Sequence, residues 1–293
     1  MLSYFQAIVL GALQGFTELL PVSSLGHSVI LPQLLGWTDV VAAQSAQESY
    51  FLAFLVGLHV ATAIALLFFY RATWARIVGG LLASVRTRRI DTPDQRLAWL
   101  LVVATIPAGL VGLLLEHTLR VVFARPLAAA AFLVVNGLIL LFGEWVRRRA
   151  EVRRAVATHA ITPTGDRRLD TLDFREAIGI GGAQVLALLP GISRSGTTMV
   201  AGLARGLDHE DSARFSFLLA TPIILAAGLY KLPDLLGPNG DGVRPQILVG
   251  SLAAGLAAYL SVRFLTRWFE TRTLIPFAVY CLVAGGFAIV RFA

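Results

Sequence analysis

Two short polar stretches interrupt an otherwise apolar sequence, and their residue types are suited to chemistry on a phosphate. The stretch Gln14–His27 contains a carboxylate, several hydroxyls and an imidazole, whereas Gly182–Thr198 contains one arginine, Arg194, among serines, threonines and glycines. An arginine near the centre of a bilayer costs about 2.5–3.5 kcal/mol on insertion scales. We therefore expect Arg194 to face a polar cavity and to serve a site.

The first stretch places its polar side chains around one helix end. Gln14 and Glu18 are four residues apart and share a helical face. A proline then breaks the helix, so the following turn brings a carboxylate together with two hydroxyls and an imidazole: Glu18, Ser23, Ser24 and His27. Each has a structural alternative, because a glutamate can be an ion-pair partner, serines can bond to nearby backbone and a histidine can be a buried donor.

The second stretch has the composition of an anion-binding turn. Pro190 and Gly191 end one helix, and the next helix begins among small polar residues. Backbone N–H groups at such a helix N-terminus bind anions, and an arginine adds a bidentate clamp for phosphate. The hydroxyls alone could be structural, whereas the glycines indicate close approach of a ligand. The candidate substrate-binding residues of this turn are Ser193, Ser195, Gly196 and Thr198, with Arg194 as the clamp.

The two stretches resemble each other and together supply the parts of a phosphoryl-transfer site. Gln14 and Gly26 are as far apart in the first as Gln184 and Gly196 are in the second. The pair offers positive charge for phosphate oxygens, a carboxylate for a metal ion or water, and a nucleophile with a proton-transfer partner. His59 lies within a long apolar run, where we expect a helix contact at most bordering this site.

The composition indicates a membrane protein that crosses the bilayer several times. The 293 residues are 56% hydrophobic and 15% charged, which is unusual for a soluble protein of this length. The formal charge of +7 comes almost wholly from arginines between apolar runs, so the positive-inside rule explains it without nucleic acid. The single cysteine, Cys281, excludes an intramolecular disulfide.

The elements expected to position the site are six membrane spans and several broken helices. About 20 apolar residues cross a bilayer. The expected spans are 50–70, 97–115, 127–145, 215–232, 247–265 and the slightly short 274–290. Four shorter runs, at 2–20, 28–37, 174–189 and 197–207, are interrupted by glycine, proline and polar residues. Such runs are typical of re-entrant or discontinuous helices that line a cavity.

The arginines predict the orientation and the organisation into halves. Arginine-rich loops follow the first and third spans, so we expect both loops in the cytoplasm and both chain termini outside. Residues 1–146 would form a first repeat, 147–173 an arginine-rich cytoplasmic connector and 174–293 a second repeat. The span count gives the two repeats opposite orientations, so the predicted fold is an all-α integral membrane protein whose broken helices meet near the midplane.

The two motifs resemble those of the bacterial undecaprenyl pyrophosphate phosphatase family, the membrane enzymes tied to bacitracin resistance. That family carries (E/Q)xxxE running into PVSSxGH, and PGxSRSxxT. Here the motifs read QGFTE at 14–18, PVSSLGH at 21–27 and PGISRSGTT at 190–198, and the similarity covers essentially the whole chain. Many members have Glu where this chain has Gln14, so we expect Glu18 to contribute more to metal binding.

The resemblance implies hydrolysis of a C55 polyprenyl pyrophosphate to the monophosphate carrier of cell-wall building, with Mg²⁺ or Ca²⁺ as the cofactor. It implies a multi-pass protein of the bacterial inner membrane whose site opens to the external side. The implied catalytic residues are Glu18, Ser24, His27 and Arg194, supported by Gln14, Ser23, Ser193 and Thr198. Either Ser24 attacks phosphorus with His27 as base, or His27 attacks directly. The expected partners are the lipid substrate and membrane lipid, with a homodimer as a further candidate.

A transporter is the competing hypothesis. Inverted repeats with broken helices are typical of transporters, so the same sequence pattern is compatible with a polyprenyl-phosphate flippase or a small-solute transporter. Release of phosphate from a polyprenyl pyrophosphate separates the two classes, because a pure transporter releases none.

Overall fold

The computed structural model describes residues 2–45, 50–123, 125–158, 167–231, 233, 237 and 241–293, and its regular elements are helices. In chain order they are α1 (Tyr4–Leu19), α2 (Ser24–Leu34), α3 (Thr38–Ser45), α4 (Tyr50–Phe69), α5 (Arg71–Thr87), α6 (Pro93–Phe123), α7 (Pro126–Thr158), η1 (Leu169–Thr171), α8 (Phe174–Ala183), η2 (Gln184–Leu188), α9 (Arg194–Ala204), α10 (His209–Tyr230), α12 (Arg244–Trp268) and α13 (Ile275–Phe292).

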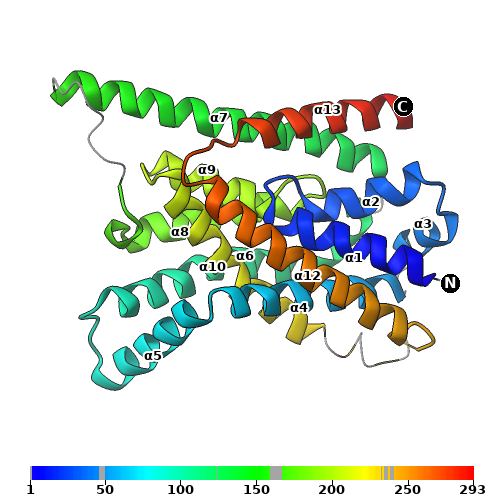
Figure 1. Ribbon diagram of the computed structural model, residues 1–293, viewed down its shortest axis with the longest axis horizontal. Helices are drawn as coiled ribbons and strands as arrows, with labels where there is room; N and C mark the ends of the chain where they lie inside the picture. Colours follow the sequence, from blue (N-terminus) through cyan, green and yellow to red (C-terminus); the bar gives the residue numbers. More distant parts are fainter. Residues whose placement is uncertain are drawn as a thin grey trace.

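Six of these helices, namely α4, α6, α7, α10, α12 and α13, are long and apolar enough to cross a membrane. Each coincides with one of the six predicted spans, and no described residue belongs to a β-strand. The prediction of an all-α integral membrane protein is therefore confirmed. Both termini lie at one end of the molecule, and the ends of α5 and α7 that carry arginine clusters lie at the other (Figure 1).

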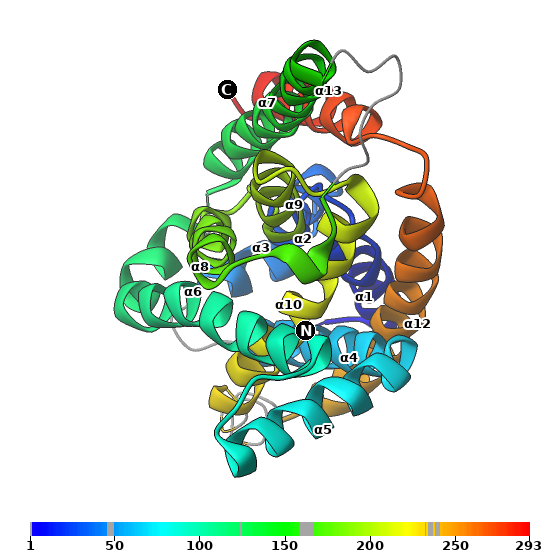
Figure 2. The same cartoon turned by 90° about the vertical axis from the view of Figure 1, so that its left-hand side faces the viewer.

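The four shorter apolar runs form the broken helices α1, α2, α8 with η2, and α9, of which α2 and α9 lie near the centre of the molecule among the spans (Figure 2). A proline interrupts each pair, Pro21 between α1 and α2 and Pro190 between η2 and α9. Ser23 then caps α2 and Ser193 caps α9, each accepting a hydrogen bond from the backbone N–H three residues on. The chain thus starts a new helix directly after each proline turn.

Small residues let α1 approach α12 closely. A Cβ on Gly11 would lie 2.2 Å from the carbonyl oxygen of Gly250, and one on Gly15 would lie 2.2 Å from that of Ala254. Larger side chains would push the helices apart, which is why membrane helix contacts favour small residues. The helix that carries Gln14 and Glu18 therefore packs closely against the span α12.

The connecting segments contain structure beyond the sequence prediction. The arginine-rich segment after the first span folds into α5, and the predicted connector 147–173 begins inside α7, which continues to Thr158. Residues 159–166 of that connector lie outside the described part of the chain. The division into two inverted repeats stays a prediction.

Candidate active site

The turns that follow Pro21 and Pro190 interlock. The Ser23 hydroxyl oxygen accepts hydrogen bonds from the backbone N–H groups of Gly26, at 3.3 Å, and of Gly191, at 3.2 Å. A Cβ on Gly26 would lie 2.8 Å from the Cα of Gly191, so the two backbones approach too closely for a side chain there. From the other turn, the Ser195 hydroxyl donates to the carbonyl of Leu20 at 3.1 Å. The two motifs therefore form one site.

Ser23 and Gly191 hold left-handed backbone conformations at this junction. Ser23 has φ 70°, and Gly191 has φ 106°. A non-glycine residue with positive φ is uncommon and costs roughly 1–2 kcal/mol. The two backbone hydrogen bonds to its hydroxyl help to offset that strain, so Ser23 fixes the turn as well as lining it.

A buried asparagine on α7 links the same two turns. The Asn136 side-chain amide donates to the carbonyl of Pro21 at 2.9 Å, and its oxygen accepts the backbone N–H of Ser193 at 2.9 Å. The side chain is fully buried. Asn136 could not be recognised as a site residue from the sequence, because a single amide within an apolar span belongs to no motif. Because Asn136 contacts the turn at Pro21 and the turn after Pro190, it positions these two turns of the site relative to each other.

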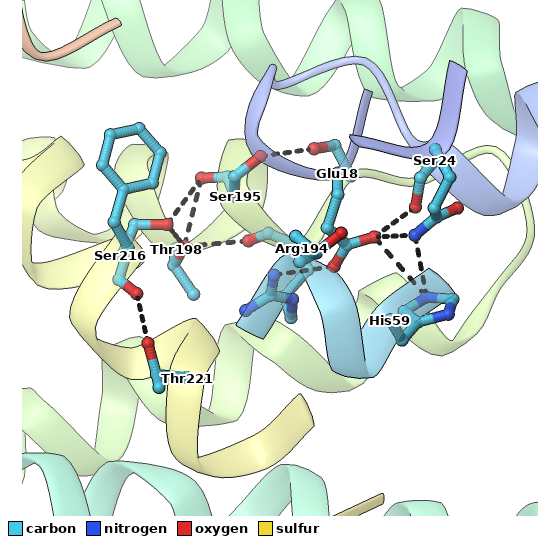
Figure 3. A network of polar contacts seen from close by, with 12 residues as sticks. Glu18, Ser24, His59, Arg194, Ser195, Thr198, Ser216 and Thr221 are labelled. Carbon is cyan, nitrogen blue, oxygen red and sulfur yellow. Dashed lines mark hydrogen bonds and ion pairs between the residues drawn. The ribbon is translucent and has the colours of Figure 1, made fainter. Parts of the chain in front are cut away.

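Glu18 is the centre of the polar network (Figure 3). Its Oε1 accepts a hydrogen bond from the guanidinium of Arg194 at 2.8 Å, and its Oε2 accepts one from the hydroxyl of Ser24 at 2.5 Å. The amide of Gln14 donates to the same Oε2 at 2.9 Å. The carboxylate is 7% exposed and the Arg194 side chain 16%, so the ion pair is well shielded from water. The structure brings together Gln14, Glu18, Ser24 and Arg194 as predicted.

His59 on α4 is part of this network, whereas the sequence predicted a helix contact that at most borders the site. Its Nε2 lies 3.1 Å from the Gln14 amide nitrogen and 3.6 Å from Glu18 Oε2. Its Nδ1 lies 2.8 Å from the carbonyl of Leu55, one turn earlier in α4. An amide nitrogen can only donate, so His59 Nε2 accepts from Gln14 and Nδ1 carries the proton. The sequence placed His59 only in an apolar run, which gave no signal for this role.

His27 has different partners from those that the motif suggested. Its Nδ1 lies 2.6 Å from the carbonyl of Ser23, and its Nε2 lies 2.8 Å from the hydroxyl of Tyr280 on α13. The imidazole also stacks on the Tyr280 ring, with centroids 5.6 Å apart. Among the described residues no hydrogen bond joins His27 to Ser24. The structure therefore offers Glu18, and not His27, as the proton acceptor beside Ser24.

The remaining predicted residues mainly build the start of α9. The hydroxyls of Ser193 and Ser195 lie 3.0 Å apart, and the backbone N–H of Gly196 donates to Ser193 at 3.1 Å. Thr198 donates to the carbonyl of Arg194 at 2.8 Å, and its hydroxyl lies 2.6 Å from that of Ser216 on α10 (Figure 3). These side chains are buried and use their polar groups within the protein. They fix the helix end from which Arg194 projects.

The donor set is compatible with a divalent cation that also binds phosphate. Among the described residues no three His, Cys, Asp or Glu side chains gather at one point. The Gln14 amide oxygen, however, is buried beside Glu18 without a hydrogen-bond partner. Mg²⁺ commonly uses one or two carboxylates and completes its shell with water and substrate phosphate. Glu18 and Gln14 suit such a shared cation, whereas an all-protein cage is not present in the described part.

Comparisons with known proteins extend over almost the whole chain. Residues 7–287 match the family model described as bacitracin resistance protein BacA. The chain is 56% identical to undecaprenyl-diphosphatase 2 of Frankia alni and 57% identical to undecaprenyl-diphosphatase of Mycolicibacterium paratuberculosis, each alignment covering 100% of this chain and 98% of the relative. It is 45% identical to undecaprenyl-diphosphatase 2 of Chromobacterium violaceum, over 96% of this chain and 95% of that protein.

Proposed function

This chain belongs to the bacitracin resistance protein BacA family, and on that premise we propose that it is an undecaprenyl diphosphatase. It hydrolyses the pyrophosphate of undecaprenyl diphosphate to undecaprenyl phosphate and inorganic phosphate. The product is the lipid carrier of cell-wall synthesis, and its recovery gives resistance to bacitracin. The observation that carries the assignment of the site is the simultaneous contact of Glu18 with Arg194 and with the Ser24 hydroxyl.

Ser24 is the nucleophile of the proposed mechanism. Its hydroxyl already donates to Glu18 Oε2 at 2.5 Å, which is the nucleophile–base arrangement that covalent catalysis requires. Ser24 Oγ attacks the terminal phosphorus, a Ser–O–P bond forms, and the bond to the bridging oxygen breaks. Undecaprenyl phosphate leaves, and the Ser24 proton passes to Glu18. Water then attacks the phosphoserine, and the departing Ser24 oxygen recovers its proton from Glu18 as inorganic phosphate is released.

Arg194 and two helix N-termini bind the phosphates. The guanidinium projects from the first residue of α9, and Ser24 is the first residue of α2. Both helix ends direct backbone N–H groups and partial positive charge toward the interlocked turns. An arginine clamp on a transferring phosphoryl group is typically worth 10³–10⁵ in rate. Arg194 thus stabilises the negative charge that develops on the phosphate oxygens. Before substrate binds, Glu18 holds the Arg194 guanidinium in place.

His27 acts on the turn and not on phosphorus in this proposal. Both of its ring nitrogens have protein partners, Ser23 and Tyr280, so it supports the turn that carries Ser24. Direct attack by His27 is the alternative, and it makes a different covalent intermediate. Phosphohistidine is labile in acid and phosphoserine is stable, so acid treatment of the trapped enzyme distinguishes the two.

We further propose that Glu18 and the free oxygen of Gln14 hold a divalent cation together with the substrate. When bound, the cation would neutralise charge on the phosphate oxygens. The site opens to the external side of the inner membrane in this proposal, as the family resemblance implies. Both motif turns come from one chain, so a homodimer would contain two such sites.

Phosphate release from undecaprenyl diphosphate by the purified protein in detergent tests the function. We expect release that a chelator removes and that added Mg²⁺ or Ca²⁺ restores. Arg194→Ala should lower the rate by about 10³-fold, whereas Arg205→Ala, at the exposed opposite end of α9, should leave it unchanged. A wild-type protein that releases no phosphate would instead favour the transporter hypothesis, and an active Arg194→Ala variant would refute the site.

A further inference from the structure

The outer face of α12 changes along its length from apolar to strongly basic. Large apolar side chains recur at every fourth position and are 46–67% exposed: Leu248, Leu252, Leu256, Leu260 and Phe264. In a span this row faces the acyl chains of the bilayer. The row ends beside Arg263 and Arg267, which lie one helical turn apart on the same face. Figure 2 shows α12 at the edge of the molecule.

A shallow groove of about 580 Å³, largely open to the outside of the protein, lies where the apolar row meets these arginines. Its lining combines three guanidinium groups with two aromatic rings: Leu260, Arg263, Phe264, Arg267, Trp268, Thr271 and Arg272. The Arg272 guanidinium lies over the Trp268 ring, 5.9 Å from its centroid. Tryptophan and arginine at the end of a span are typical of the membrane–water interface, where lipid headgroups lie. We name this feature the α12 groove.

The arginines of the α12 groove have no acidic partner within ion-pair distance among the described residues. Some arginines elsewhere in the described part of the chain are paired, as Arg194 is with Glu18 and Arg167 is with Glu176. The positive-inside rule accounts for positive charge in a loop. The rule does not require three guanidinium groups to line one groove at the end of the apolar row on α12, which faces the acyl chains. The charge in the groove is thus complementary to an anion that carries its own hydrocarbon chain.

We propose that the α12 groove binds an anionic glycerophospholipid. The phosphate diester lies among Arg263, Arg267 and Arg272, which can donate two hydrogen bonds each to phosphate oxygens. The glycerol backbone lies near Trp268, and one acyl chain follows the row from Phe264 toward Leu248. A zwitterionic lipid fits less well, because its cationic headgroup would lie among the arginines.

A lipid in the α12 groove is coupled to the active site through α1. The opposite face of α12 packs against α1 at Gly11 and Gly15. Near the groove, the Ser261 hydroxyl donates to the carbonyl of Phe16 at 3.2 Å, two residues before Glu18. A lipid that orders this end of α12 therefore also stabilises the helix that carries Gln14 and Glu18. Binding adds its free energy to the stability of the folded protein by mass action.

Binding of phosphatidylglycerol to the delipidated protein, measured by native mass spectrometry and by thermal unfolding, tests the proposal. The test variant is the triple substitution Arg263→Gln, Arg267→Gln and Arg272→Gln. The matched control is Arg86→Gln, Arg88→Gln and Arg89→Gln at the end of α5, which removes the same charge from residues that do not line the groove. We expect phosphatidylglycerol to bind the wild type and the control equally, and the test variant at least tenfold more weakly.

Two further ligands identify the source of the phosphate. Phosphatidylcholine and soluble glycerol 3-phosphate should each raise the unfolding temperature much less than phosphatidylglycerol at equal concentration. Equal stabilisation by either ligand, or unchanged phosphatidylglycerol binding by the test variant, would overturn the proposal. Phosphate release in detergent without added lipid should be the same for the wild type and both triple variants. That readout shows that each variant is folded and keeps the lipid proposal separate from the proposed function.

Discussion

Replacement of Asn136 by alanine should impair catalysis although the residue belongs to neither motif. The Asn136 amide joins the carbonyl of Pro21 to the backbone N–H of Ser193, each at 2.9 Å. These contacts set the relative position of the turn before α2 and the turn before α9. Glu18 and Arg194 project from the helices on either side of those turns, so the substitution should loosen the geometry between carboxylate and guanidinium.

The expected loss of stability follows from two buried groups, the Pro21 carbonyl and the Ser193 N–H, which lose the Asn136 amide as their partner. An unsatisfied buried donor or acceptor costs about 1–3 kcal/mol, and both Pro21 and Ser193 are buried. Among the described residues the Pro21 carbonyl keeps only the thiol of Cys281, a weak donor 3.9 Å away. The expected loss in the free energy of unfolding is therefore about 2–6 kcal/mol. A misplacement of about 1 Å at reacting groups can lower the rate roughly 10²-fold, and we expect a fall in kcat/KM of that order.

The assay compares phosphate release and thermal unfolding for Asn136→Ala and Ser84→Ala. Ser84 is likewise buried and links two helices, because its hydroxyl accepts from the indole N–H of Trp99 on α6 at 2.9 Å. Its substitution should lower the unfolding temperature and leave kcat/KM unchanged. If Asn136→Ala loses stability but retains kcat/KM within about twofold of the wild type, the amide is structural only and the reasoning is wrong.

Two further predictions concern residues around the interlocked turns. Gly191→Ala should destabilise the protein by at least about 2 kcal/mol, because φ is 106° and the new Cβ would lie 2.3 Å from the carbonyl of Ala129. Thermal unfolding checks this against Gly182→Ala, which meets no atom within 4 Å and should be neutral or slightly stabilising; equal unfolding temperatures would contradict it. His59→Phe removes the acceptor for Gln14 and should lower kcat/KM roughly fivefold, the equivalent of about 1 kcal/mol for one hydrogen bond. Unchanged kinetics would show that His59 does not position Gln14.

The membrane fold was largely predictable from the sequence because span length and hydropathy follow directly from bilayer thickness. All six predicted spans coincide with described helices. The short helix α5 was not predicted, since arginines are interspersed along it and its apolar residues are too few to form a span. The inverted arrangement of the two halves stays a prediction that rests on the arginine distribution.

The core of the site was predictable because its residues lie in two motifs with recognisable chemistry. The pairing of Glu18 with Arg194 and with Ser24 follows the prediction that both motifs meet in one place. The contributions of His59, Asn136 and Tyr280 could not be predicted, because each is a single polar residue on a long apolar helix. Only the packing of α4, α7 and α13 against the motifs brings them there.

In the proposed mechanism Ser24, activated by Glu18, attacks the pyrophosphate. The rate of phosphate release from undecaprenyl diphosphate by a folded Ser24→Ala variant tests it most directly. The variant keeps the ion pair between Glu18 and Arg194 and lacks only the hydroxyl that donates to Glu18 Oε2. We predict a fall in kcat of at least about 10³-fold with the unfolding temperature near that of the wild type. A rate within tenfold of the wild type would contradict the claim and would favour direct attack by water or by His27.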